Sequence, residues 1–146
     1  MAPSVTDRSV TPCPTCGVRN RVPASAKGLP RCASCKGSLP WLVEAGDAGF
    51  AAATTATVPV LVDLWAPWCG PCRSMAPVLE RAATERAGRL KVVKVNIDVA
   101  PGVARRFGVQ AVPTLLLLSN GREVGRQVGA VGEAALGRWL DSAPTG

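Results

Sequence analysis

Six cysteines, arranged as three Cys-x-x-Cys pairs, constrain this chain of 146 residues more than any other feature of its sequence. The pairs are Cys13/Cys16, Cys32/Cys35 and Cys69/Cys72. A two-residue gap folds into a tight turn that presents both sulfurs together, which suits a metal ion or a redox-active disulfide. The chain has no histidine and no tyrosine. Mechanisms that need an imidazole base, a histidine ligand or a tyrosyl nucleophile are therefore excluded.

The composition is that of a folded domain with a small appendage. Apolar residues make up 47% of the chain and charged residues 18%, which is too apolar for a disordered chain. No apolar stretch approaches the length of a membrane-spanning helix, and residues 1–10 lack the apolar segment of a secretory signal. We therefore expect a cytoplasmic protein with no membrane association, in a compartment where structural disulfides are rare.

The net charge of +7 is divided between the N-terminal third of the sequence and the remainder. Residues 1–46 carry an excess of four positive charges, and the remainder carries an excess of three. Four thiolates around a divalent metal would lower the first excess to about two. No stripe of alternating aromatic and basic residues accompanies the charge, so we expect no nucleic-acid partner.

The composition changes near residue 40. Residues 11–40 are rich in proline, glycine, serine, cysteine and basic residues. A segment this short, with few apolar side chains, cannot be stabilised by a hydrophobic core alone and needs a cross-link. From residue 41 onward, aliphatic runs alternate with turn signals. We predict a flexible tail over residues 1–10, a tetra-cysteine zinc ribbon over residues 11–40 and one larger domain over residues 41–146.

The larger part alternates strand and helix patterns. Strands are predicted over residues 59–65, 91–97, 114–118 and 122–127. Helices are predicted over residues 71–87, over residues 101–107 and from residue 132 onward. A further strand and helix fit residues 41–55. This order predicts an α/β fold, with a mixed central sheet flanked by helices.

The four N-terminal cysteines have the spacing of a two-knuckle zinc site, because 15 residues separate the Cys13/Cys16 and Cys32/Cys35 pairs. Two such turns can present four sulfurs in a tetrahedron, each about 2.3 Å from the ion. Four protein ligands leave no open position, so we predict one structural zinc ion. Two local disulfides, free thiols, or an iron or [2Fe–2S] site on the same ligands are the alternatives.

The Cys69-Gly70-Pro71-Cys72 segment joins a predicted strand to a predicted helix, which places Cys69 at the helix N-terminus. Unpaired backbone N–H groups and the positive end of the helix dipole stabilise a thiolate there. That thiolate is the nucleophile of thiol–disulfide exchange, and Cys72 lies one turn away, ready to attack the mixed disulfide. A Gly-Pro pair between the cysteines, with no histidine, favours a reductant. The alternative is half of a second metal site, which lacks two further ligands.

The segment Val62-Asp63-Leu64-Trp65-Ala66-Pro67-Trp68-Cys69-Gly70-Pro71-Cys72 resembles the active-site signature of the thioredoxin family. Residues 94–98, 107–109, 112–114, 120–121 and 128–130 resemble the family in the same order. The N-terminal tetra-cysteine ribbon is similar to the bacterial thioredoxin 2 branch. The resemblance implies a thioredoxin fold and a protein-disulfide reductase that acts on client proteins and is re-reduced by an NADPH-dependent thioredoxin reductase.

The resemblance also implies roles for individual residues. Cys69 is the attacking cysteine, Cys72 is the resolving one, and Asp63 is a buried carboxylate that accepts the proton of Cys72. Lys94 corresponds to a lysine near that carboxylate, although it is equally an ordinary exposed strand lysine, and Pro113 corresponds to a cis-proline opposite the disulfide. The implied rim for client peptides consists of Trp68, Gly70, Pro71, Val112, Gly129 and Ala130. Independently of the family, a lone aspartate in an apolar run is costly to bury without a purpose, and burial raises its pKa.

Two other functions remain open at the level of the sequence. The chain can be a non-catalytic binding module, with the ribbon as its recognition element, or a zinc protein switched by oxidation of its four N-terminal thiolates. No Gly-x-Gly-x-x-Gly motif follows a predicted strand, so we expect no tightly bound organic cofactor. We also expect a monomer.

Overall fold

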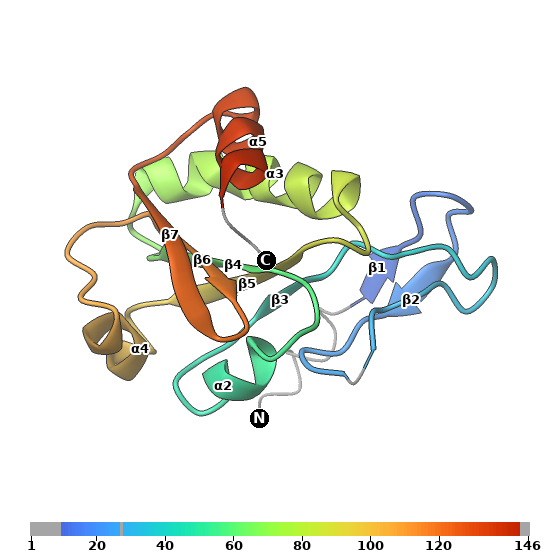
Figure 1. The fold of residues 1–146 in the computed structure, drawn as a ribbon, viewed down its shortest axis with the longest axis horizontal. Helices are drawn as coiled ribbons and strands as arrows, with labels where there is room; N and C mark the ends of the chain where they lie inside the picture. The colour runs from blue at the N-terminus through green and yellow to red at the C-terminus, as the bar shows by residue number, and fades with distance from the viewer. Residues whose placement is uncertain (1–9, 27, 144–146) are drawn as a thin grey trace.

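The computed structural model describes residues 10–26 and 28–143 (Figure 1). Its elements are β1 (Val10–Pro12), β2 (Arg19–Arg21), β3 (Leu42–Glu44), α2 (Phe50–Ala53), β4 (Val60–Trp65), α3 (Gly70–Glu85), β5 (Lys91–Asn96), α4 (Pro101–Arg106), β6 (Thr114–Ser119), β7 (Arg122–Val128) and α5 (Glu133–Ser142). Each strand and helix predicted from residue 41 onward has a counterpart here. No helix in these two ranges is long and apolar enough to cross a bilayer.

A five-stranded mixed sheet forms the centre of the fold, in the order β3-β5-β4-β6-β7. Strands β3, β5 and β4 run parallel to one another, whereas β6 is antiparallel to both β4 and β7. Figure 1 shows α3 and α5 on one face of the sheet and α2 and α4 on the other. The predicted α/β architecture with a mixed central sheet is therefore confirmed.

The uninterrupted leucine run of β6 follows from burial of the sheet on both faces. Leu115 and Leu117 pack in one apolar cluster with Met75 and Leu79 of α3. Leu116 and Leu118 point to the opposite face and share a second cluster with Phe50 of α2. Because successive side chains of a strand alternate between faces, a strand covered on both sides is apolar at every position.

Helix α3 begins and ends at recognisable signals. Cys69 is its N-cap, Pro71 occupies the first turn, and Pro77 lies inside the helix. The helix ends at Glu85, two residues before the predicted end. The chain then turns through Gly88, whose φ of +83° favours glycine.

The N-terminal ribbon is built on the antiparallel β1–β2 hairpin. Its apolar residues Val22 and Leu39 are buried in the same cluster as Val60 of the sheet. Through these two residues the ribbon packs against the larger part of the chain. The predicted tail lies outside the described residues, apart from Val10, which begins β1. The boundary near residue 40 stays a prediction.

Candidate active site and metal centre

A disulfide joins Cys69 and Cys72 where β4 leads into α3, with the two Cα atoms 5.3 Å apart. Cys69 is the N-cap residue, and its sulfur accepts a hydrogen bond from the backbone N–H of Cys72 at 3.1 Å. Both sulfurs lie at the predicted helix N-terminus. After reduction, the same N–H group and the helix dipole favour a thiolate on Cys69.

The surroundings of the disulfide combine buried apolar contacts with one exposed aromatic residue. Cys69 is 5% exposed and Cys72 3%, and Val112 packs against the cluster that they form with Ala66. The neighbouring Trp68 is 66% exposed. The disulfide is therefore largely buried, next to an exposed aromatic side chain.

The segment that faces the disulfide contains the predicted proline. The Val112–Pro113 peptide bond is cis, and the Cys69 sulfur lies 3.7 Å from the Val112 carbonyl oxygen. The Pro113 carbonyl accepts a hydrogen bond from the N–H of Gly129 at 2.9 Å, and Ala130, the residue after Gly129, is exposed. The chain thus brings together segments more than forty residues apart.

Asp63 is a carboxylate buried inside the fold. It is 1% exposed, and neither carboxylate oxygen finds a hydrogen-bond partner within residues 10–26 and 28–143. Burial raises the pKa of Asp63 from 3.8 to about 6, and the charge of Lys94 opposes this rise only in part. Lys94 is opposite Asp63 in the β4–β5 register, and its ammonium group sits 4.9 Å from the centre of the Trp65 ring.

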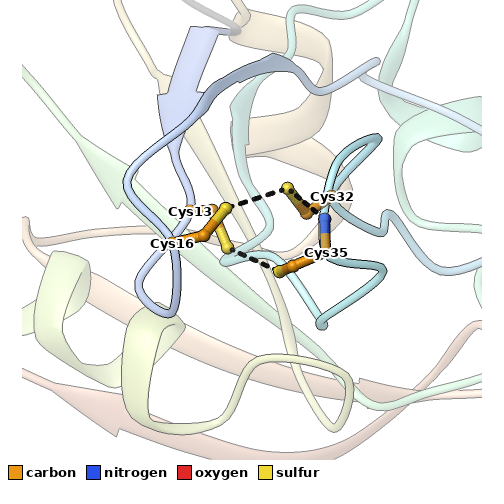
Figure 2. A group of neighbouring side chains, drawn as sticks. All are labelled: Cys13, Cys16, Cys32 and Cys35. Atoms are coloured by element: carbon orange, nitrogen blue, oxygen red, sulfur yellow. Dashed lines mark hydrogen bonds between the residues drawn. The ribbon is translucent and has the colours of Figure 1, made fainter.

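Cys13, Cys16, Cys32 and Cys35 form a second sulfur cluster, drawn in Figure 2. All four sulfurs lie within 4.8 Å of one another. The Cys13–Cys35 and Cys16–Cys32 sulfur distances are both 3.6 Å. A tetrahedral ion with sulfur ligands at about 2.3 Å requires sulfurs roughly 3.8 Å apart. The tetrad therefore fits a metal ion with only a small adjustment.

Backbone N–H groups point at these sulfurs. Thr15 donates to Cys13 at 3.4 Å, Ser34 to Cys32 at 3.4 Å and Gly37 to Cys35 at 3.4 Å. Several hydrogen bonds lower the pKa of the Cys32 thiol, and the one donated by the backbone N–H of Cys35 has the largest effect. Such donors favour thiolates, the form in which cysteine binds metals.

Two contributors to these sites were not apparent from any sequence pattern. The side chain of Asn20 donates to the Cys32 sulfur at 3.5 Å and accepts from the N–H of Ala33 at 2.9 Å. It thereby links the first hairpin to the second cysteine pair. Asp98 accepts a hydrogen bond from the Trp68 indole at 3.3 Å. Both contacts join residues distant in sequence, which local patterns do not reveal.

The comparison with known families settles the membership of the chain. The family model described as Thioredoxin matches residues 41–142, a segment that contains the disulfide, Asp63 and the cis peptide bond. The chain belongs to the thioredoxin family. With an intact Cys69–Cys72 disulfide, this thioredoxin-family chain is a thiol–disulfide oxidoreductase, a protein-disulfide reductase of the thioredoxin type.

Curated relatives agree with this membership. A thioredoxin of Haemophilus influenzae is 43% identical over 101 residues, which cover 68% of this chain and 94% of the relative. A thioredoxin of Mycobacterium tuberculosis is 52% identical over 99 residues, which cover 67% of this chain and 85% of the relative. A bifunctional thioredoxin reductase/thioredoxin of Mycobacterium leprae is 48% identical over 99 residues, which cover 67% of this chain and 22% of the relative.

The buried carboxylate has a measurable effect on stability. The folded chain binds the Asp63 proton more tightly than the unfolded chain, so stability falls as the pH rises between about 4 and 6. A pKa of about 6 instead of 3.8 corresponds to a penalty of roughly 3 kcal/mol at pH 8. We expect Asp63→Asn to raise the free energy of unfolding at pH 8 by up to about 3 kcal/mol, with no gain near pH 3.

Urea denaturation of both proteins at pH 3 and pH 8 measures this difference. A gain of equal size at the two pH values contradicts an origin in the buried charge.

Proposed function

We propose that Cys69 attacks client disulfides and that Cys72 resolves the product. The observation that carries this proposal is the place of Cys69 at the N-cap of α3, with its sulfur accepting the N–H of Cys72. The Cys69 thiolate attacks one sulfur of a client disulfide, forms a mixed disulfide and releases the first client thiolate. Cys72, as a thiolate, then attacks the Cys69 sulfur, which closes the Cys69–Cys72 bond and releases the second client thiolate. Two electrons pass from the dithiol to the client.

Asp63 is proposed as the acceptor of the Cys72 proton in the second step. Its burial and its unpaired oxygens support this role, because a carboxylate with a pKa of about 6 can take up a proton near neutral pH. Lys94, opposite it on β5, is proposed to keep that pKa from rising further through its positive charge.

The client is proposed to lie as an extended segment along the rim formed by Trp68, Gly70, Pro71, Val112, Gly129 and Ala130, beside the cis-proline Pro113. The exposed side chains of Trp68 and Val128 offer apolar contacts, and Val128 is paired with Thr114, the residue after Pro113. Apolar and backbone contacts of this kind accept many sequences, which suits a general reductase.

We further propose that a separate thioredoxin reductase returns electrons to this dithiol. Thioredoxin-family proteins are reduced by such enzymes, and the Mycobacterium leprae relative is named as a fusion of the two activities. Four thiols that must stay reduced to hold a metal suit a reducing compartment, and we propose the cytoplasm. We also propose that the chain acts as a monomer.

The tetrad is proposed to hold one zinc ion. An all-sulfur tetrahedral set with N–H groups directed at the sulfurs is suited to zinc. Cys13, Cys16, Cys32 and Cys35 would fill every coordination position, so the ion would cross-link the ribbon and take no part in disulfide exchange.

The rate of thiol alkylation tests the assignment of Cys69. In the reduced protein at pH 6.5, we expect iodoacetamide to modify Cys69 at least about ten-fold faster than a model thiol of pKa about 8.5. Cys72, which is one turn inside the helix, is expected to react much more slowly. Mass spectrometry of digests taken over time measures both rates. A non-catalytic binding module predicts instead that Cys69 reacts no faster than the model thiol.

A further inference from the structure

The first residue of β5, Lys91, is a buried cation far from the redox centre. Its exposed fraction is 0%, and burial lowers its pKa to about 8. The ammonium group donates a hydrogen bond to the carbonyl oxygen of Ala24 at 2.5 Å and lies 4.1 Å from the centre of the Trp41 ring. Burying an ammonium group is costly in free energy. The Lys91 ammonium group has no role in the disulfide exchange, so its burial needs another explanation.

Trp41 makes a second connection to the same loop. Its indole N–H donates to the carbonyl oxygen of Pro23 at 2.9 Å, and its own carbonyl accepts the N–H of Val92 in β5 at 2.8 Å. Two consecutive loop carbonyls, those of Pro23 and Ala24, are therefore held by side chains anchored at the start of β5. The adjacent Val22 is 1% exposed and packs in the core cluster of the sheet.

This junction lies at the end of the sheet opposite the disulfide. Parallel strands β4 and β5 both begin near the ribbon, and Cys69 follows the end of β4. Helix α3 starts at the disulfide and is 16 residues long, which corresponds to about 24 Å. Beyond its far end, Gly88 approaches Ser38 of the ribbon so closely that a Cβ there would lie 2.8 Å from the serine oxygen. Figure 1 shows β1 and β2 beyond this end of α3.

The loop held by Lys91 connects the two halves of the sulfur tetrad. Cys16 precedes it and Cys32 follows it, and their sulfurs are 3.6 Å apart. Because both cysteine pairs hold the ion, movement of the pairs away from each other weakens the site and makes release easier. If the loop cannot move away from β5, this separation is hindered.

We propose that Lys91 fastens the ribbon to the catalytic part of the chain and thereby slows release of the metal from the tetrad. The inference rests on the metal site proposed above. Lys91 acts here as a positioning residue, because its ammonium group holds the loop between the ligands through the Ala24 carbonyl.

Release of zinc from the full-length, zinc-loaded protein tests this role. Excess chelator is added, and the freed ion is followed with a chromogenic zinc indicator. Loss of a hydrogen bond from a charged donor leads us to expect that Lys91→Met releases zinc roughly ten-fold faster than the unsubstituted chain. Lys91→Arg, which keeps a charged donor, is expected to restore slow release. Equal rates for Lys91→Met and the unsubstituted chain overturn the proposal.

Lys94→Met is the matched control, because Lys94 lies on the same strand but its ammonium group lies over the Trp65 ring. We expect this control to release zinc at the unsubstituted rate, and equal acceleration by both substitutions overturns the specific role of Lys91. If Lys91→Met does not fold, Trp41→Phe removes only the indole donor to Pro23 and is expected to speed release as well. Unchanged release from Trp41→Phe then contradicts the proposal.

Amide hydrogen exchange separates this inference from the metal assignment. In Lys91→Met, peptides that cover residues 20–26 are expected to exchange faster, while those of α3 keep the unsubstituted rate. Protein purified without metal overturns the zinc proposal, yet exchange still decides whether Lys91 holds the loop. Unchanged exchange over residues 20–26 refutes that role.

Discussion

Replacing Cys69 by serine is expected to abolish the reduction of insulin disulfides, with a loss of roughly a thousand-fold or more in rate. A serine hydroxyl stays protonated at neutral pH even at the N-terminus of a helix, so the attacking anion is lost. The loss does not depend on destabilising the fold, because Cys69 and Ser differ by one atom at a helix N-cap, where serine is also favoured. Turbidity from precipitating insulin chains, measured with dithiothreitol as the electron source, gives the rate.

Cys72→Ser is the matched control for that experiment. This variant keeps the attacking thiol but cannot close the intramolecular disulfide, so mixed disulfides with client proteins should accumulate. They are visible as reducible high-mass bands on a non-reducing gel. Full insulin reduction by Cys69→Ser, or accumulation of the same mixed disulfides by both variants, would refute the assigned division of labour.

Removal of the metal is expected to unfold the ribbon and to destabilise the rest of the chain with it. Structural zinc contributes on the order of 10 kcal/mol to small domains of this kind. The ribbon residues Val22 and Leu39 share a core cluster with Val60 of the sheet, so the loss extends beyond the ribbon. A decrease of about 3 kcal/mol in the free energy of unfolding of the larger part lowers its melting temperature by roughly 10 °C.

Differential scanning calorimetry of chelator-treated and zinc-restored protein measures this change. Cys32→Ala is expected to reproduce the effect of the chelator, because it removes the ligand that receives the Asn20 amide. Re-addition of zinc should restore the melting temperature of the unsubstituted chain but not that of Cys32→Ala. If the metal-free protein melts at the same temperature as the zinc form, metal binding at the tetrad does not stabilise the ribbon.

The disulfide and the sulfur tetrad lie near opposite ends of the same sheet. Substitutions at Cys69 change exchange chemistry where the parallel strands end, and loss of the metal acts near where they begin. Because Lys91 lies at the second end, Lys91→Met is expected to leave insulin reduction unchanged while it accelerates zinc release.

Much of this protein was determined by the sequence on its own. The order of strands and helices from residue 41 onward followed from the spacing of apolar residues, since that spacing records which face of a local element is buried. The position of Cys69 at a helix start followed from a strand that ends before Gly70-Pro71. Asp63 stood out because a single carboxylate interrupts an apolar strand. These features are local, and a local pattern is enough to predict them.

Only the tertiary structure decided how distant segments meet. Lys91 reads as an ordinary strand residue, yet it contacts Ala24, 67 positions earlier in the chain. In the same way, the unpaired oxygens of Asp63 and the docking of the ribbon at the end opposite the disulfide depend on which surfaces pack together. Burial and long-range hydrogen bonding are properties of the assembled core. The periodicity of one segment does not indicate which other segment will pack against it.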